Sequence, residues 1–468
     1  MVENIILFKK DREEIGDIFS KMPMTTYHVL ATAVLFFTFA IEAWEFLIPS
    51  FLLPTLMPFF GIGTGVGGLL VSAPYFGALL GAYTFAPLAD KMGRKKSIIA
   101  GLAGYGVANA FSVLAGPAYW EIFFIARFIS GFFLIMVMVQ PFAMLEEFLP
   151  TKSRGRITTY LASGWPAGTL LAVAAVYLIL PRFSWQGVIL ISSIMALVYI
   201  IPVAFLLKET PYFLVGAGKQ KEAKETINTI SRGKITVPEN VTLYTVNVKR
   251  GSIKELFRKD LRNYTLLILG ANVAFSLGYW GLFAWLPVIL VDRGISFLDT
   301  ILYIAIGAVA EFPGYIAAAY LEEKKKLGRK WVMAIFLGVS GVATFWLAYS
   351  YTLADVMAAI IVLSFFNLGA WGVWDAWQPE LYPSNIRGTL MGWVGGSQRI
   401  SNSIAPSLFG ILVALSIIGF TGVIVIVAVA LWITIFFIYG LKETLNVPLD
   451  EAIHIDTTGE THEGGGAK

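Results

Sequence analysis

The chain has 468 residues, of which 57% are hydrophobic and only 14% are charged, and its formal net charge is +4. Soluble domains carry about 25% charged residues, so this composition excludes a soluble globular protein and places the chain in a lipid bilayer. The near-neutral charge argues against a nucleic-acid partner. The lack of cysteine excludes disulfides, thiolate metal sites and a cysteine nucleophile.

Residues 1–27 are polar and mixed in charge, without the pattern of a cleavable signal peptide, and we expect them to lie on the membrane face. Twelve apolar segments follow, each close to the ~20 residues that cross a bilayer. They lie near 28–50, 65–88, 97–115, 119–143, 157–180, 186–207, 264–290, 299–321, 331–350, 354–378, 389–414 and 417–441. A polar linker at 208–262 divides them into two sets of six, and its stretch KQKEAKETINTI (219–230) predicts a short amphipathic helix. The polar tail, 442–468, is expected to be disordered and cytoplasmic.

The basic residues are distributed unevenly between the two sides of the membrane. Of the 35 Lys and Arg residues, Arg182 and Arg293 are the two in loops on one side, and Arg127 and Arg399 fall inside predicted spans. The others lie in the termini and in the loops on the opposite side. Cytoplasmic loops are enriched in Lys and Arg, so the pattern predicts a multi-pass protein of the plasma membrane with both termini in the cytoplasm.

Three short motifs recur at an offset of 233 to 235 residues, which is half the chain. EFLPTKSRG (147–155) returns as ELYPSNIRG (380–388), GRK (93–95) as GRK (328–330), and KET (208–210) as KET (442–444). Repeats at one common offset indicate a half-molecule duplicated in the same orientation. The predicted fold is therefore an all-α integral membrane protein of twelve transmembrane helices. Two pseudo-symmetric six-helix bundles occupy 28–207 and 263–441.

These motifs resemble those of the major facilitator superfamily. LADKMGRKK (88–96) is similar to the family's loop between helices two and three, and the two Glu-x-x-Pro-x-x-x-Arg-Gly motifs and KETPYFLVGAGKQKEA (208–223) resemble sugar-porter signatures. EAWE (42–45) resembles the Asp-Gly-Tyr-Asp motif of aromatic-acid/proton symporters. EFPGYIAAAYLEEKKKLGRK (311–330) and QRISNSIAP (398–406) resemble organic-ion transporters. The resemblance implies transport by alternating access of two bundles.

Glu42 and Glu45 are the strongest functional candidates. They are three residues apart on one helix, about 20–25 Å from its start, where an ionised carboxylate is unfavourable and a bound proton is favoured. Arg127 reaches a similar depth. In sugar-porter-like proteins an acid of helix one faces an Arg of helix four, which implies that Glu42 or Glu45 pairs with Arg127 until a proton or substrate intervenes. The alternatives are a permanent structural pair or a Glu facing the outer vestibule.

Arg399 and Glu311 are the corresponding charges of the second half. Arg399 is a candidate for gripping an anionic substrate bidentately, and Glu311 is an alternative partner that neutralises Arg399 at rest. Further candidates for the site are aromatic or polar: Trp280, Trp285, Trp371, Trp374 and Trp377, and Gln140, Asn272, Asn367, Gln398 and Asn402. For each of these, lipid contact, core packing or interhelical hydrogen bonding is the alternative role.

A last group of charges lies at the predicted cytoplasmic helix ends, namely Asp90, Arg94, Glu147, Arg154, Glu380 and Arg387. We expect them to form a latch that holds the two bundles together in the outward-open state, with helix capping and topology control as the alternative. His28, His454 and His462 receive no role.

The sequence shows no Walker-type loop and no spacing typical of a metal site, so neither a cofactor nor a metal is expected. The predicted function is that of a proton-coupled secondary transporter, not an enzyme. It would act as a monomer on a small organic solute, with an organic or aromatic acid anion favoured. The alternatives are a sugar/proton symporter, a drug or organic-cation transporter and, more remotely, a non-transporting sensor or a channel.

Overall fold

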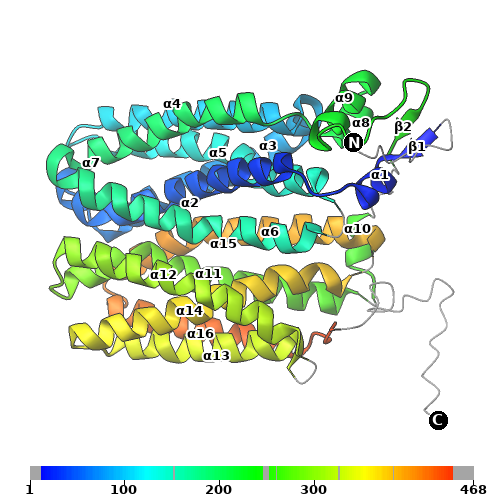
Figure 1. Ribbon diagram of the computed structural model, residues 1–468. Coiled ribbons are helices and arrows are strands. Elements are labelled where there is room, and N and C mark those ends of the chain that lie inside the picture. Colours follow the sequence, from blue (N-terminus) through cyan, green and yellow to red (C-terminus); the bar gives the residue numbers. More distant parts are fainter. Residues whose placement is uncertain are drawn as a thin grey trace, which may run out of the picture.

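The computed structural model describes residues 12–150, 153–245, 252–259, 261–324, 327–382 and 384–445. Long helices form two bundles that lie side by side with their axes nearly parallel (Figure 1). The first bundle contains α2 (Thr26–Phe60), α3 (Thr64–Met92), α4 (Arg94–Phe111), η1 (Ser112–Leu114), α5 (Trp120–Phe148), α6 (Arg154–Ala162) and α7 (Gly164–Leu206). The second contains α11 (Arg262–Asp292), α12 (Phe297–Glu322), α13 (Gly328–Ala348), α14 (Leu353–Trp377), η3 (Gln378–Leu381), α15 (Ser384–Ala414) and α16 (Phe420–Tyr439).

The helices account for the predicted membrane crossings. Within the described residues, 10 helices are long and apolar enough to cross a membrane. One of these, α7, holds two predicted spans, because its backbone breaks at Phe183 and Ser184. The 31-residue α15 is not among these 10 helices, but it is long enough to cross a bilayer. The all-α membrane fold with two helix bundles is therefore confirmed, and the helices are consistent with twelve crossings.

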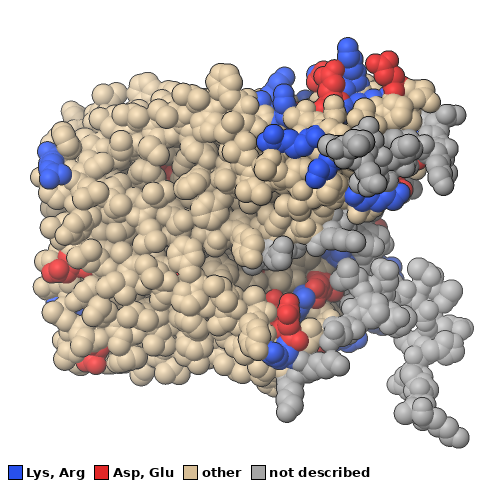
Figure 2. Space-filling model, viewed as in Figure 1, with Lys and Arg blue, Asp and Glu red and all other residues tan. Residues whose placement is uncertain are grey.

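One end of the molecule carries most of the charge, and we call it the charged end (Figure 2). The start of α2, the end of α16 and the linker lie there (Figure 1). The small elements at this end are α1 (Ile15–Lys21), α8 (Pro211–Gly216), α9 (Gln220–Ile230), α10 (Ile253–Leu256) and a parallel pair of strands, β1 (Arg12–Glu14) and β2 (Thr242–Tyr244), with Arg12 opposite Thr242. The predicted amphipathic helix of the linker is α9. Residues 1–11 of the N-terminal lead and residues 446–468 of the tail lie outside the described residues.

The repeated motifs of the first half meet each other at the charged end. The Glu209 carboxylate accepts hydrogen bonds from the backbone N–H groups of Arg94 (2.9 Å) and Lys95 (3.2 Å), at the first turn of α4. Gly93 precedes that turn with φ of 93°, and a Cβ there would lie 2.3 Å from the Glu209 carboxylate. The KET glutamate therefore caps the GRK helix, and only glycine fits before it.

The second half repeats this arrangement. The Glu443 carboxylate accepts from the backbone N–H groups of Arg329 (3.1 Å) and Lys330 (3.0 Å), at the start of α13. Gly328 has φ of 67°, and a Cβ there would lie 2.4 Å from Glu443. In both halves a KET glutamate accepts from two N–H groups of a GRK motif that begins with a glycine of positive φ. A duplicated unit predicts this repetition.

The two bundles pack most tightly at the end opposite the charged end. There α3 and α15 approach so closely that a Cβ on Gly68 would lie 2.5 Å from the Pro406 carbonyl oxygen. Ser407 also donates a hydrogen bond of 2.7 Å to Ser72 across the interface. In the half of α15 nearer the charged end, a Cβ on any of three glycines would meet no atom within 4 Å: Gly388, Gly392 and Gly396. The contact between α3 and α15 therefore closes the opposite end.

Candidate substrate and proton site

A buried ion pair lies at the centre of the first bundle. Glu45 of α2 and Arg127 of α5 form a salt bridge, and both side chains are 0% exposed. Arg127 also donates through Nη2 to the backbone oxygen of Glu45 at 2.8 Å. Of the two glutamates in the EAWE motif, the structure therefore places Glu45 against Arg127.

Three further polar side chains complete the hydrogen bonding of Glu45. Ser192 of α7 donates to Oε2 at 2.7 Å, Ser130 of α5 donates to Oε1 at 3.2 Å, and Asn109 of α4 donates to Oε2 at 3.4 Å. Asn109 also accepts from Arg127. Every acceptor position of the ionised carboxylate is thus occupied, and a proton added to Glu45 would have to displace one of these donors.

Glu42 lies one turn before Glu45, and its surroundings are different. It is 0% exposed, yet neither carboxylate oxygen has a hydrogen-bond partner among the described residues. The charged group that acts on it is Arg399 of α15, in the other bundle. The Nε of Arg399 is likewise without a partner among the described residues. A buried acid of the first bundle and a guanidinium of the second therefore interact electrostatically, and each keeps hydrogen-bonding capacity that no described residue uses.

A small cavity lies between the two bundles. Its volume of about 20 Å³ holds roughly one water molecule. It is lined by residues from five helices: Leu47, Phe51, Thr169, Tyr279, Phe283, Leu286, Ile304, Ala308, Glu311, Ile360 and Ser364. Glu311 of α12 is only 3% exposed, and its Oε2 has no partner among the described residues. Glu42 and Tyr83 interact electrostatically with Arg399, and no ion pair between Glu311 and Arg399 occurs among the described residues.

The tryptophans divide into two groups. Trp280 contacts Tyr75 of α3 and Trp165 of α7 across the bundle interface, with ring centroids 5.0 and 5.5 Å away, and Trp371 stacks on Phe275 at 4.2 Å. The indole nitrogens of Trp280 and Trp371 have no partner among the described residues. These two remain candidates for walling a substrate site.

The other tryptophans pack inside the second bundle. Trp285 donates to the Pro406 carbonyl at 2.9 Å, Trp374 donates to the Asn272 side chain at 3.2 Å, and the fully buried Trp377 packs against Trp374. Their contacts fit the alternative role of core packing.

The amide side chains differ in how many of their hydrogen-bonding groups remain without a partner. Asn272 donates to the Val394 carbonyl (2.8 Å) and to Ser397 (2.9 Å), so it joins α11 to α15 and has little capacity left. Three others each keep a buried oxygen with no partner among the described residues: Gln140, Asn367 and Asn402. Gln398 is half-buried. These last four residues can still offer hydrogen bonds to a solute.

At the charged end, the charge pairs are duplicated like the motifs. Arg94 pairs with Glu147 at 3.2 Å in the first bundle, and Arg329 pairs with Glu380 in the second. Arg329 was missed at the sequence level, although the second GRK repeat marks it. These pairs join helices of the same bundle.

The remaining latch residues also make contacts within one bundle. Arg154 donates to the Leu149 carbonyl at 3.5 Å, and Arg387 donates to the Tyr382 carbonyl at 3.1 Å. Asp90 lies in α3, and its side chain is outside what the structure describes. His28 is buried and accepts a hydrogen bond of 3.0 Å from the Thr25 backbone, so it caps α2.

Comparison with known proteins identifies the family. Residues 30–326 match the family model described as Major Facilitator Superfamily. The chain is 32% identical to the niacin transporter NiaP of Acinetobacter baylyi, over 82% of this chain and 87% of that protein. It is 24% identical to a gallate transporter of Pseudomonas putida, over 85% and 88%.

Solved structures agree on the fold. The partially occluded, inward-open form of the xylose transporter XylE from E. coli superimposes with a TM-score of 0.72 at 17% identity, over 90% of this chain and 99% of that one. At this identity the likeness concerns the fold alone. With a family model over more than half its length and a relative above 30% identity, the chain belongs to the major facilitator superfamily and is a multi-pass membrane transporter, not an enzyme.

Proposed function

We propose that the protein is a proton-coupled transporter of a small aromatic or other organic acid anion, acting by alternating access in the plasma membrane. One observation carries this proposal: a saturated buried ion pair, Glu45 with Arg127, lies one helical turn from Glu42, a buried and unpartnered acid that interacts electrostatically with Arg399 of the other bundle. The relatives named above are transporters of niacin and gallate, and both of these compounds are rings that bear a carboxylate.

The Glu42–Arg399 arrangement couples an anion to a proton. A substrate carboxylate that binds the Arg399 guanidinium bidentately competes with the Glu42 carboxylate for the same positive charge. Two carboxylates around one guanidinium leave an uncompensated negative charge in a buried site, which is strongly unfavourable. Binding of the anion therefore favours a proton on Glu42, and the two travel together.

Glu45 and Arg127 provide the second part of the coupling. The ionised Glu45 holds α2, α4, α5 and α7 together through its donors, and transfer of the same proton from Glu42 to Glu45 would remove the charge that binds Arg127. We propose that this release allows the first bundle to reorient. Trp280 and Trp371 would wall the ring of the substrate, and Gln140, Asn367, Gln398 and Asn402 would supply hydrogen bonds.

We assign the charged end to the cytoplasm, because loops rich in Lys and Arg remain on that side. The opposite end is closed by α3 and α15, and the described charge pairs of the proposed latch stay within single bundles. Both features fit a state that faces the cytoplasm.

The test is uptake into reconstituted vesicles that are more alkaline inside than outside, with radiolabelled nicotinate or benzoate as the probe and protein-free vesicles as the blank. The wild-type protein should accumulate a probe only while the pH gradient lasts. Glu45→Gln should lose accumulation but keep exchange of probe across the membrane, because the neutral side chain mimics the protonated state. Glu121→Gln, which removes an exposed carboxylate at the start of α5, is the matched control and should behave as wild type.

Gradient-driven accumulation that survives in Glu45→Gln would overturn the coupling role. Uptake of xylose or of an organic amine, with no uptake of either acid, would overturn the proposed substrate class and favour one of the alternatives.

A further inference from the structure

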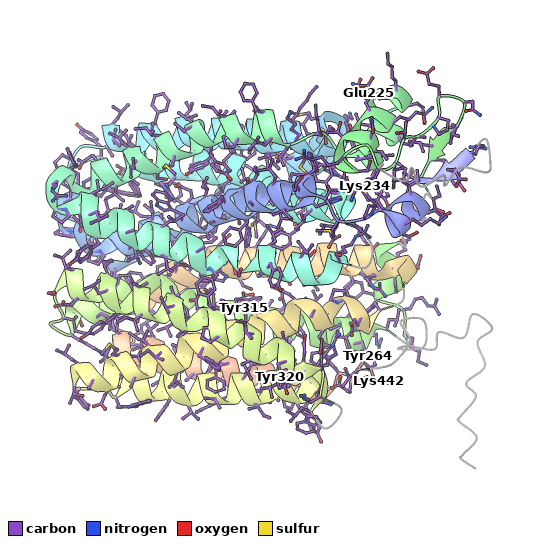
Figure 3. All side chains as sticks on the ribbon, viewed as in Figure 1. Glu225, Lys234, Tyr264, Tyr315, Tyr320 and Lys442 are labelled. Carbon is purple, nitrogen blue, oxygen red and sulfur yellow. The ribbon has the colours of Figure 1, made fainter. Side chains whose placement is uncertain are left out.

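The second bundle contains two carboxylates that the proposed mechanism does not use. Glu311 of α12 reaches the central cavity with an unpartnered oxygen and is 3% exposed. Asp375 of α14 is exposed and lies nearer the charged end. Tyr315, one turn after Glu311 on α12, interacts electrostatically with both. Figure 3 shows Tyr315 within the second bundle.

The backbone explains why these three side chains line up. Residues 311 and 315 are one turn apart on α12, and the step advances about 6 Å toward the charged end. Gly372 of α14 lies against the Tyr315 ring, since a Cβ there would be 2.8 Å from the ring. Asp375 follows three residues later on the same face of α14. The next residue, Ala376, accepts a hydrogen bond from Arg329 of the charged end at 3.3 Å.

The described groups that face Glu311 carry no positive charge. Tyr279 of α11 and Tyr315 interact with it electrostatically, and the other polar cavity residues are Thr169 of α7 and Ser364 of α14. Among the residues that the structure describes, no Lys, Arg or His forms an ion pair with Glu311 or Asp375. An ionised carboxylate without a partner is unfavourable in an apolar cavity, so Glu311 is suited to hold a proton and pass it on.

We infer that Glu311, Tyr315 and Asp375 form a second proton path, which connects the central cavity to the cytoplasm and is separate from the Glu45–Arg127 pair. In each passage the Glu311 carboxyl gives its proton to the Tyr315 hydroxyl oxygen. The Tyr315 hydroxyl gives its own proton to the Asp375 carboxylate, and Asp375 releases it to water. Only O–H bonds break and form, and no electron is exchanged.

The consequence is a second proton in each transport cycle. This inference rests on the proposed function for its direction and its coupling to substrate. A monovalent anion that travels with two protons carries a net charge of +1, so the membrane potential would drive uptake as well as the pH gradient.

The proton-to-substrate ratio tests the path. It is measured in reconstituted vesicles with radiolabelled benzoate or nicotinate as the probe, an internal pH-sensitive dye to count protons, and transport current as a second readout. The wild-type ratio should be near two, with an inward positive current. Asp375→Asn and Tyr315→Phe should lower the ratio to near one and abolish most of the current, and Glu311→Gln should lower the ratio in the same way. Glu323→Gln, an exposed acid at the end of α12, is the matched control and should keep the wild-type ratio.

Gradient-free exchange of the probe verifies folding, and Asp375→Asn and Tyr315→Phe should keep it within about twofold of wild type. If one of these two variants loses exchange, the proton-to-substrate ratio of the other variant tests the path. A wild-type ratio near one, or a ratio near two that persists in a variant competent for exchange, overturns the second path and leaves the proposed function intact. Absence of acid transport by the wild type, or driven accumulation in Glu45→Gln, would instead count against the proposed function.

Discussion

At the scale of single residues, the Glu45–Arg127 pair is an interdependent unit. Each partner is fully buried, and removing one leaves the other charge uncompensated. We expect Arg127→Met to lower the free energy of unfolding by about 3–5 kcal/mol, as measured by denaturation in detergent. The double variant Glu45→Gln/Arg127→Met should recover most of that loss, because no buried charge remains. A double variant as unstable as the single one would contradict this account.

Glu209 gives a prediction of how the stability of the protein depends on pH. Burial raises the pKa of this carboxyl above 4.5, although amide donors at Thr210, Lys95 and Arg94 oppose the shift. The folded state then binds the proton more tightly than the unfolded state, so this group's contribution to stability decreases as pH rises from about 4.5 through the raised pKa. Glu209→Gln should flatten the fall in melting temperature over this window. Parallel melting curves for variant and wild type would be the contrary result.

Single residues also show which parts of the site could be predicted from the sequence. Glu45, Arg127, Glu42 and Arg399 were predictable, because charged side chains stand out in apolar segments. The partner of each glutamate could not be predicted. Glu45 pairs with Arg127 within the first bundle, whereas Glu42 interacts with Arg399 of the second bundle. The partners at 109, 130 and 192 were missed, because small neutral polar residues in a span usually join helices. Their common contact appears only when four helices are assembled.

At the scale of elements, we propose that the contact between α3 and α15 controls which end is open. A Cβ on Gly410 would lie 2.5 Å from the Thr64 carbonyl oxygen, so a larger side chain should push these helices apart at the opposite end. Overpacking costs roughly 1–3 kcal/mol. We therefore expect Gly410→Val to shift the protein toward an outward-open state.

A cysteine at the fully buried Ser72 reports this shift, because the chain has no cysteine of its own. A membrane-impermeant thiol reagent added outside should label Ser72→Cys at least about fivefold faster when Gly410→Val is present, as an energy change of this size implies. Gly392→Val, placed where a Cβ meets no atom within 4 Å, is the control and should leave the rate unchanged. Equal labelling of both variants would show that this contact does not control access.

The boundaries of the elements were less predictable than their number. α2 was expected to end near residue 50, yet it continues to Phe60 through Pro49, Pro54 and Pro58. Prolines are tolerated in membrane helices when neighbouring helices satisfy the freed backbone groups. The loop expected between 180 and 186 appears as the backbone break at Phe183 and Ser184.

At the scale of the whole molecule, the repeats explain what the sequence predicted and what it did not. The common offset of the motifs indicates two like halves, and the structure brings each KET glutamate to its own GRK helix. Contacts between the halves, such as that of Ser407 with Ser72, are not encoded by a repeat within one half, and we propose that they set the state of the transporter. The second carboxylate path could not be foreseen, because it joins residues on two helices.

The central claim is that the two bundles reorient around the buried charges, so that one end opens as the other closes. Spin labels at cysteines replacing Gly63 and Leu415 report the separation of α3 and α15 at the opposite end, and labels replacing Leu88 and Gly392 report it at the charged end. We predict that an acid pH with benzoate or nicotinate changes the two distance distributions in opposite directions, and that Glu45→Gln shifts them without a pH change. Distances that stay fixed at both ends in a protein that transports the probe would contradict the account.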